Sequence, residues 1–199
     1  MRKMQKYITG VRFDLAAKLI YASYRLQGLN TTWHIDLYKN HILTFNGGWE
    51  WPGGTKNSVD DFISAFNHLI DNFDPEQAGI IPISADGHIV GGAHRTAIAY
   101  LKGVDLSVEC KEKTRRPYDY KFFQNRFPFG IPAMTPETNR KAVLPKLDPV
   151  YMDEMALEFC RRCPDLRMVI LFPIAQGYDN EVDSLLRTKG DIIYSLKIK

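Results

Sequence analysis

The sequence predicts a mixed α/β protein, because segments with helical spacing alternate with short aliphatic runs that are typical of strands. Six segments have the apolar spacing or composition of helices, at residues 13–27, 33–42, 59–73, 93–102, 151–163 and 180–188. Four shorter aliphatic runs predict strands, at residues 80–83, 89–90, 166–174 and 191–198. The clearest helix begins with a capping-box-like pair, Ser58 and Asp61. Hydrophobic residues make up 45% of the 199-residue chain, which is enough for a packed core.

Charged side chains gather at the start of the predicted helix at 13–27. Arg12, Asp14 and Lys18 lie near its first turn, while its apolar side chains fall on one face. Because they stand together at a helix end, the three charged side chains could face a functional site.

Residues 80–108 predict a compact unit of two short strands and a helix. Asp86-Gly87 separates two aliphatic runs, which is a hairpin signal, and Gly91-Gly92 ends the second run. The helix at 93–102 follows, with Gly103 at its C-terminal end. The start of a helix presents unpaired N–H groups and the positive end of the helix dipole, so it is predicted to hold phosphate.

This helix start also resembles a known signature. The residues that match are Asp86, Gly87, Gly91, Gly92, His94 and Arg95. They resemble the signature of the ParB/sulfiredoxin-like superfamily over residues 46–109, about a third of the chain, which implies a ParB/sulfiredoxin-like core. Sulfiredoxins carry a cysteine where this chain has Ala93. ParB proteins continue into a helix-turn-helix domain. The stretch at 117–136 in this chain is rich in proline, which interrupts helices, so it does not favour such a domain.

The chain is most similar to the free-amino-acid kinase branch, such as the serine kinases, which also use a histidine and an arginine after the glycine. The resemblance implies a nucleotide-dependent phosphotransferase with Mg²⁺ and ATP or ADP as cofactors. The phosphate-binding residues would be Gly91, Gly92, His94, Arg95 and Thr96. In that branch an upstream glutamate acts on the acceptor hydroxyl, and Glu50 occupies the matching place.

Two carboxylates and a lysine complete the predicted site. Glu50 lies between Trp49 and Trp51, and burial against these indoles would raise its pKa toward the range of a general base. Asp86 is a second catalytic candidate, and Lys56 is placed to meet a nucleotide phosphate. The structural alternatives are a solvated loop carboxylate for Glu50, a turn residue for Asp86 and a solvated lysine for Lys56. For His94 the structural alternative is a bond to a nearby carbonyl.

The sequence divides into four parts. An N-terminal helical segment at 1–45 precedes the core at 46–110. Residues 111–148 interleave basic and aromatic side chains, which suits single-stranded nucleic acid, a lid over a nucleotide or a loop that aromatic residues hold to the core. Residues 149–199 predict a small C-terminal α/β extension, and a strand so close to the last residue suggests a domain of a longer protein.

Composition limits the classes of function. The net charge of +3, from 26 basic and 23 acidic residues, does not by itself indicate nucleic acid. No run of 18 apolar residues and no apolar signal core occurs, so we expect no membrane span and a cytoplasmic location. Cys160 and Cys163 have CxxC spacing, but without a second pair their apolar helix favours core packing, and no protein metal ligand is assigned.

The leading prediction is a kinase whose partners are a nucleotide and a small hydroxyl-bearing acceptor. One alternative is a ParB-like module that binds a nucleotide or nucleic acid without catalysis. Another is an accessory domain of a larger cell-envelope polysaccharide enzyme. The sequence leaves open which acceptor is used, whether ATP, ADP or CTP is bound, and the oligomeric state.

Overall fold

The structure is a computed structural model and describes residues 3–8, 12–48, 50, 54–111, 118, 122, 132–134, 141–143, 158–159 and 162–163. The helices in this part of the chain are η1 (Lys3–Tyr7, 3-10), α1 (Asp14–Leu26), α2 (Thr32–Asn46), α3 (Val59–Asp71) and α4 (Ala93–Lys102). The strands are β1 (Ile81–Ser84), β2 (Val108–Lys111), β3 (Pro132–Met134) and β4 (Lys141–Val143). The predicted mixed α/β class is confirmed.

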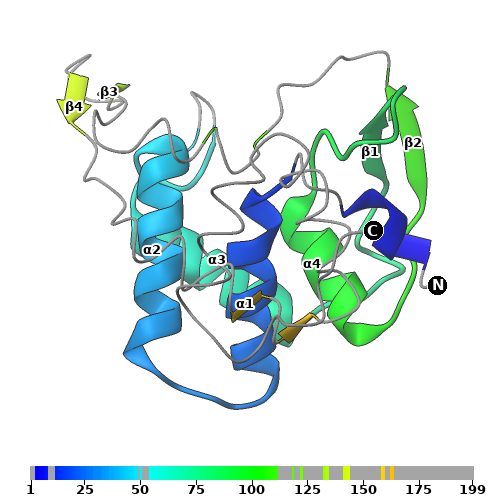
Figure 1. Cartoon of the computed structure of the whole chain (residues 1–199), viewed down its shortest axis with the longest axis horizontal. Coiled ribbons are helices and arrows are strands. Elements are labelled where there is room, and N and C mark those ends of the chain that lie inside the picture. Colours follow the sequence, from blue (N-terminus) through cyan, green and yellow to red (C-terminus); the bar gives the residue numbers. More distant parts are fainter. Residues whose placement is uncertain are drawn as a thin grey trace, which may run out of the picture.

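Helix α1 is the central element of the fold. Its residues from Asp14 to Ser23 are all buried, which is the pattern of a helix surrounded by protein on every side. It packs against α2, α3 and α4, and Figure 1 shows the β1–β2 pair on the side of α4 away from α1. The charged residues at the start of α1 therefore lie inside the molecule.

The largest apolar cluster joins residues that are far apart in sequence. Buried members come from η1, α1 and α4, and they include Phe159 and Cys163. Phe159 and Cys163 are 0% and 1% exposed within this cluster, so the core-packing interpretation of Cys163 is confirmed. Cys160 lies outside the described residues. Phe62, Phe66 and Ile70 of α3 form a second cluster with the facing side chains of α1 and α2.

Local sequence signals set the helix ends. The Ser58 side chain accepts a hydrogen bond from the Asp61 N–H at 3.2 Å, which confirms the predicted cap of α3. Helix α4 has the predicted bounds and is flanked by Gly92 and Gly103, with φ of 76° and 70°. A side chain at these left-handed positions would be strained, so glycine suits both ends. Helix α2 runs beyond the predicted Ile42 to Asn46, where Gly47 with φ of 79° ends it.

The predicted hairpin forms in part. Across the Asp86-Gly87 turn, the Ser84 N–H donates to the His88 carbonyl at 2.7 Å and the Val90 N–H to the Pro82 carbonyl at 2.9 Å, but the second run makes only an isolated bridge, between Ile83 and Ile89. Strand β1 also pairs with β2 in parallel, from Ile81 opposite Val108 to Ser84 opposite Lys111, and this pairing was not predicted. A parallel pair requires a crossover, and α4 provides it. The Gly91-Gly92 pair directly before α4 ends the second run after Val90, so this run is too short to become a strand.

Other predictions fall largely outside the described residues. The predicted strands at 166–174 and 191–198 and the helix at 180–188 lie there, as does most of the helix at 151–163. Between 111 and 148, where little regular structure was expected, β3 and β4 form a short antiparallel pair with Pro132 opposite Val143. Pro132 is the first residue of its strand, where the missing N–H is tolerated. Among the described residues, no helix has both the length and the apolar character to cross a bilayer.

Candidate functional site

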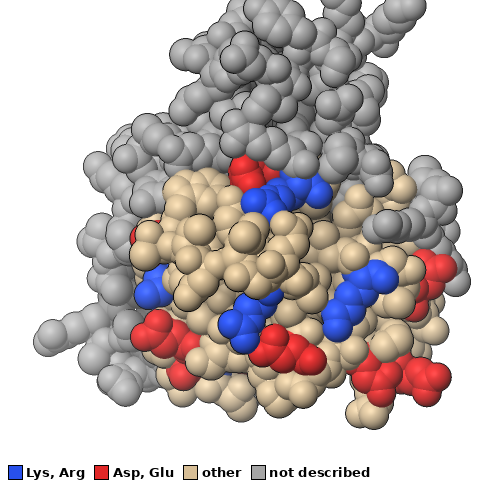
Figure 2. Space-filling view, turned by 90° about the horizontal axis from the view of Figure 1, so that it is seen from below, with Lys and Arg blue, Asp and Glu red and all other residues tan. Residues whose placement is uncertain are grey.

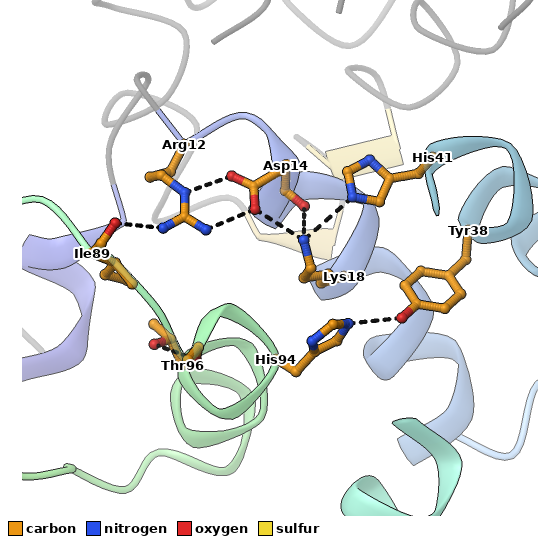
Figure 3. Close-up of polar contacts among 9 residues, drawn as sticks. Arg12, Asp14, Lys18, Tyr38, His41, Ile89, His94 and Thr96 are labelled. Carbon is orange, nitrogen blue, oxygen red and sulfur yellow. Dashed lines mark hydrogen bonds and ion pairs between the residues drawn. The ribbon is translucent and has the colours of Figure 1, made fainter. Parts of the chain in front are cut away.

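Three charged residues form a buried cluster at the start of α1. Arg12, Asp14 and Lys18, here called the α1 charge cluster, are only 3%, 1% and 4% exposed. Arg12 donates from Nε to Asp14 Oδ1 at 2.6 Å and from Nη2 to Oδ2 at 2.8 Å, and Lys18 Nζ lies 2.9 Å from Oδ2 (Figure 3). Two cations thus share one carboxylate. Burial raises the pKa of Asp14, but Arg12 and Lys18 outweigh it and hold that pKa well below its usual value.

The α1 charge cluster contacts two other parts of the fold, the segment before α4 and helix α2. Arg12 Nη1 donates to the Ile89 carbonyl at 2.6 Å, just before α4. Lys18 Nζ lies 3.2 Å from the Asp14 carbonyl oxygen and 3.3 Å from His41 Nε2 on α2. Burial and the Lys18 charge lower the pKa of His41 well below its usual value, so His41 is neutral near pH 7.

His94, the second residue of α4, points toward α2 and α3. Its Nε2 lies 2.7 Å from the Tyr38 hydroxyl (Figure 3). Its ring meets the Phe66 ring edge-on, with centroids 4.5 Å apart. Burial and the Lys18 charge lower the pKa of His94 well below its usual value, with a further contribution from Lys56. The expected structural alternative, a bond from His94 to a carbonyl, is replaced by this bond to Tyr38.

Arg95 and Thr96 bond within the core unit. Arg95 Nη1 donates to the Ala78 carbonyl, and a Cβ on Gly92 would lie 3.0 Å from Arg95 Nη2. The guanidinium therefore connects the loop before β1 to the start of α4. Thr96 is fully buried, and its hydroxyl donates to the Gly92 carbonyl at 3.1 Å. Because His94 and Arg95 contact different elements, the structure does not bring these two side chains together.

Glu50 and Lys56 form an ion pair in the loop before α3. Lys56 Nζ donates to Glu50 Oε1, and the Thr55 N–H donates to Oε2 at 2.9 Å. These bonds, the one from Lys56 most of all, lower the pKa of Glu50. The prediction of a raised Glu50 pKa is wrong, because the carboxylate is partly exposed and paired with a cation. Its predicted neighbours Trp49 and Trp51 lie outside the described residues.

Asp86 lies in the exposed turn after β1. Its carboxylate accepts a hydrogen bond from the Ser84 hydroxyl and lies 3.6 Å from His88 Nε2. The bond from Ser84 lowers the pKa of Asp86. Both contacts are within the turn, so the geometry matches the structural alternative in which Asp86 stabilises the turn.

Aromatic side chains cover the α1 charge cluster. Tyr118 packs edge-on against Phe45 and Phe122, with ring centroids 4.7 and 4.8 Å apart. Lys18 Nζ lies 5.5 Å from the Phe45 ring centre, and Arg12 Cζ lies 5.7 Å from that of Tyr118. Of the three alternatives for the basic and aromatic region, these contacts match aromatic side chains that hold the chain to the core.

Tyr38 and His41 were not among the predicted site residues. They belong to a set of aromatic and histidine residues that share one face of α2 at helical spacing: His34, Tyr38, His41 and Phe45. This spacing was the available signal, but polar aromatic residues on one helix face are also typical of a core. Only the folded chain brings Tyr38 to His94.

Comparisons with protein-family models, with curated proteins and with solved structures give no match. The resemblance to the ParB/sulfiredoxin-like superfamily therefore depends on the signature residues alone. Within the described residues, no group of three or more histidine, cysteine, aspartate or glutamate side chains could hold a metal ion.

Proposed function

We propose that this protein is a nucleotide-dependent phosphotransferase that holds the phosphates of ATP or ADP at the start of α4 and transfers phosphate to a small hydroxyl-bearing acceptor. The observation that supports this best is the position of α4 near two lysines, the buried Lys18 and the partly exposed Lys56. Helix α4 begins at Ala93, and its N-cap residue Gly92 provides no side-chain hydrogen bond to the first turn. Lys18 and Lys56 both act electrostatically on His94 in its first turn. A phosphate here would meet unpaired N–H groups, the helix dipole and nearby positive charge.

The order of elements supports a ParB/sulfiredoxin-like core as part of the same proposal. Strand β1, the Asp86-Gly87 turn, the Gly91-Gly92 pair, helix α4 and strand β2 follow one another as that signature implies. Packing alone already explains the glycine at position 92, since a Cβ there would lie 2.6 Å from Ile81 Cδ1. The glycine is therefore compatible with a ligand but does not require one.

The described residues suggest a division of roles. Lys56 would neutralise phosphate charge, and the ionised Glu50 would orient the acceptor hydroxyl, since its lowered pKa makes it a weak base. Mg²⁺ would supply further neutralisation of the phosphates, and it is usually held by substrate phosphates, water and one or two carboxylates. Glu50 is the carboxylate of the predicted site that could meet it.

Calorimetry with ATP, ADP and CTP in the presence of magnesium tests the proposal. We expect Lys56→Met to weaken binding about tenfold or more, because a charge-assisted bond to phosphate is lost. Lys39→Met is the matched control. Lys39 is an exposed lysine of α2 that also pairs with a carboxylate, since its Nζ lies 3.9 Å from Asp60 Oδ1. Absence of nucleotide binding, or equal binding by both variants, contradicts the proposal.

A second candidate is a module that binds a nucleotide without phosphate transfer. The Glu50–Lys56 pair favours it, because a carboxylate with a lowered pKa is poorly suited to remove a proton. Binding of ATP with no transfer to any hydroxyl acceptor would identify this function. For nucleic acid, the face in Figure 2 offers little support, since its basic side chains are interspersed with acidic ones and form no concentrated patch.

A further inference from the structure

A buried hydroxyl on α2 contacts the histidine at the start of α4. Tyr38 is 0% exposed, and its hydroxyl lies 2.7 Å from His94 Nε2. The Tyr38 ring packs against Tyr21 and Phe66, with centroids 4.7 and 5.3 Å apart, and this packing fixes the hydroxyl in place. Burial raises the pKa of Tyr38, so the phenol keeps its proton near neutral pH.

The direction of this hydrogen bond decides the tautomer of His94. A buried O–H group needs an acceptor, and among the described residues His94 Nε2 is the acceptor that the Tyr38 hydroxyl reaches. His94 is neutral near pH 7, because burial and the Lys18 charge lower its pKa. A neutral imidazole has one donor and one acceptor nitrogen. If Nε2 accepts from Tyr38, the ring proton is on Nδ1.

His41 offers a parallel case in the same part of the fold. Its Nε2 lies 3.3 Å from Lys18 Nζ, and an ammonium group can only donate. The neutral His41 ring therefore also accepts at Nε2 and carries its proton on Nδ1. If Nε2 of His94 accepts from Tyr38, the two histidines have the same tautomer, each held by a different donor.

We propose that Tyr38 is a positioning residue that holds His94 as the Nδ1–H tautomer, so that His94 offers a hydrogen-bond donor to the bound nucleotide. This inference rests on the proposed function, which supplies the ligand. Within the part of the chain that the structure describes, His94 Nδ1 has no hydrogen-bond partner. His94 therefore donates to a phosphate oxygen and does not serve as the general base for the acceptor hydroxyl.

NMR of the ligand-free, ¹⁵N-labelled protein tests the tautomer directly. Two-bond ¹H–¹⁵N correlations report which ring nitrogen carries the proton, and the signals lost in His94→Asn identify His94 among the five histidines. We expect an Nδ1–H ring in the wild type and a shift toward Nε2–H in Tyr38→Phe. Tyr21→Phe is the matched control, because its hydroxyl bonds to Asn67 at 2.9 Å and not to His94. An Nε2–H or doubly protonated wild-type ring at pH 7, or an unchanged ring in Tyr38→Phe, overturns the inference.

Binding of MgADP tests the role of the donor. The comparison uses the Tyr38→Phe background, in which no hydroxyl loses its acceptor when His94 is replaced. There, His94→Asn keeps an N–H near the δ position, whereas His94→Gln moves it to the ε position. We expect the Asn variant to bind at least about tenfold more tightly, as one charge-assisted bond implies. Equal affinities overturn the assignment of Nδ1 as the donor. An Nδ1–H ring without any wild-type binding of MgADP retains the tautomer and refutes the proposed function.

Discussion

Replacing Asp14 by asparagine would leave two buried cations without a counter-charge. The carboxylate of Asp14 accepts three charge-assisted hydrogen bonds, at 2.6 and 2.8 Å from Arg12 and at 2.9 Å from Lys18. An asparagine has one acceptor oxygen, and its NH₂ group would face a cation. Breaking a buried pair by removing one partner costs about 3–5 kcal/mol. Asp14→Asn should therefore lower the free energy of unfolding by about that amount.

Thermal unfolding followed by circular dichroism measures this loss. For a chain of this size each kcal/mol shifts the midpoint by about 2–4 °C, so we expect a decrease of roughly 6–20 °C. The pKa of Asp14 is lowered in the folded state, so its contribution is fully present above the unfolded value of about 3.9 and is lost as the pH falls through the folded value. The difference between wild type and variant should stay constant from pH 7 to about 5 and narrow only in stronger acid.

Asp71→Asn provides the matched control. Asp71 also pairs with an arginine, Arg25, at 2.7 Å, but both side chains are about half exposed, at 49% and 45%. Solvent screens such a pair, so its loss should leave the midpoint nearly unchanged. If Asp14→Asn unfolds at the same temperature as Asp71→Asn, the α1 charge cluster is not a buried, tightly coupled network and the reasoning fails.

Two further predictions concern pH and the start of α4. The folded state keeps His41 neutral, whereas the same side chain in the unfolded chain binds a proton below about pH 6.5. The free energy of unfolding should therefore fall with decreasing pH, with a slope that approaches about 1.4 kcal/mol per pH unit for this group. His41→Gln, whose amide oxygen can still accept from Lys18, should reduce that slope in urea unfolding between pH 7 and 5, and an unchanged slope would show that His41 is protonated in the folded state. Gly28 and Gly92 both have positive φ, so replacing either by alanine should cost about 1–2 kcal/mol of backbone strain. Gly92→Ala should destabilise the protein more than Gly28→Ala, because of the two only the Cβ at position 92 would clash with a side chain, at 2.6 Å from Ile81 Cδ1. Equal midpoints in chemical denaturation would refute the predicted clash.

The sequence predicted those elements whose signals are local. Helix α4 was predicted with its observed bounds because Gly92 and Gly103 occur where the backbone needs positive φ. The start of α3 was predicted from Ser58, since a cap involves residues three positions apart. Pairing of β1 with β2 was not predicted, because the competing hairpin signal at Asp86-Gly87 is closer in sequence.

The candidate site was only partly predictable. The charged residues at the start of α1 were recognised, but their mutual pairing and burial depend on α2 and on the Ile89 carbonyl. His94 was recognised from its motif, whereas its partner Tyr38 lies 56 positions away. The pKa of Glu50 was predicted in the wrong direction because the Lys56 ion pair outweighs burial.

The sequence by itself determined the four α-helices that the structure describes, the serine start of α3, the glycine boundaries of α4 and which side chains carry charge. These properties follow from residue spacing and backbone preferences within a few positions. The tertiary structure decided which charged side chains form ion pairs and which nitrogen of His94 is hydrogen-bonded to Tyr38. Burial of α1 on all sides forces Arg12 and Lys18 to share Asp14, and the packing of α2 brings the Tyr38 hydroxyl to His94. Such contacts join distant segments, so they depend on the packing of the whole chain.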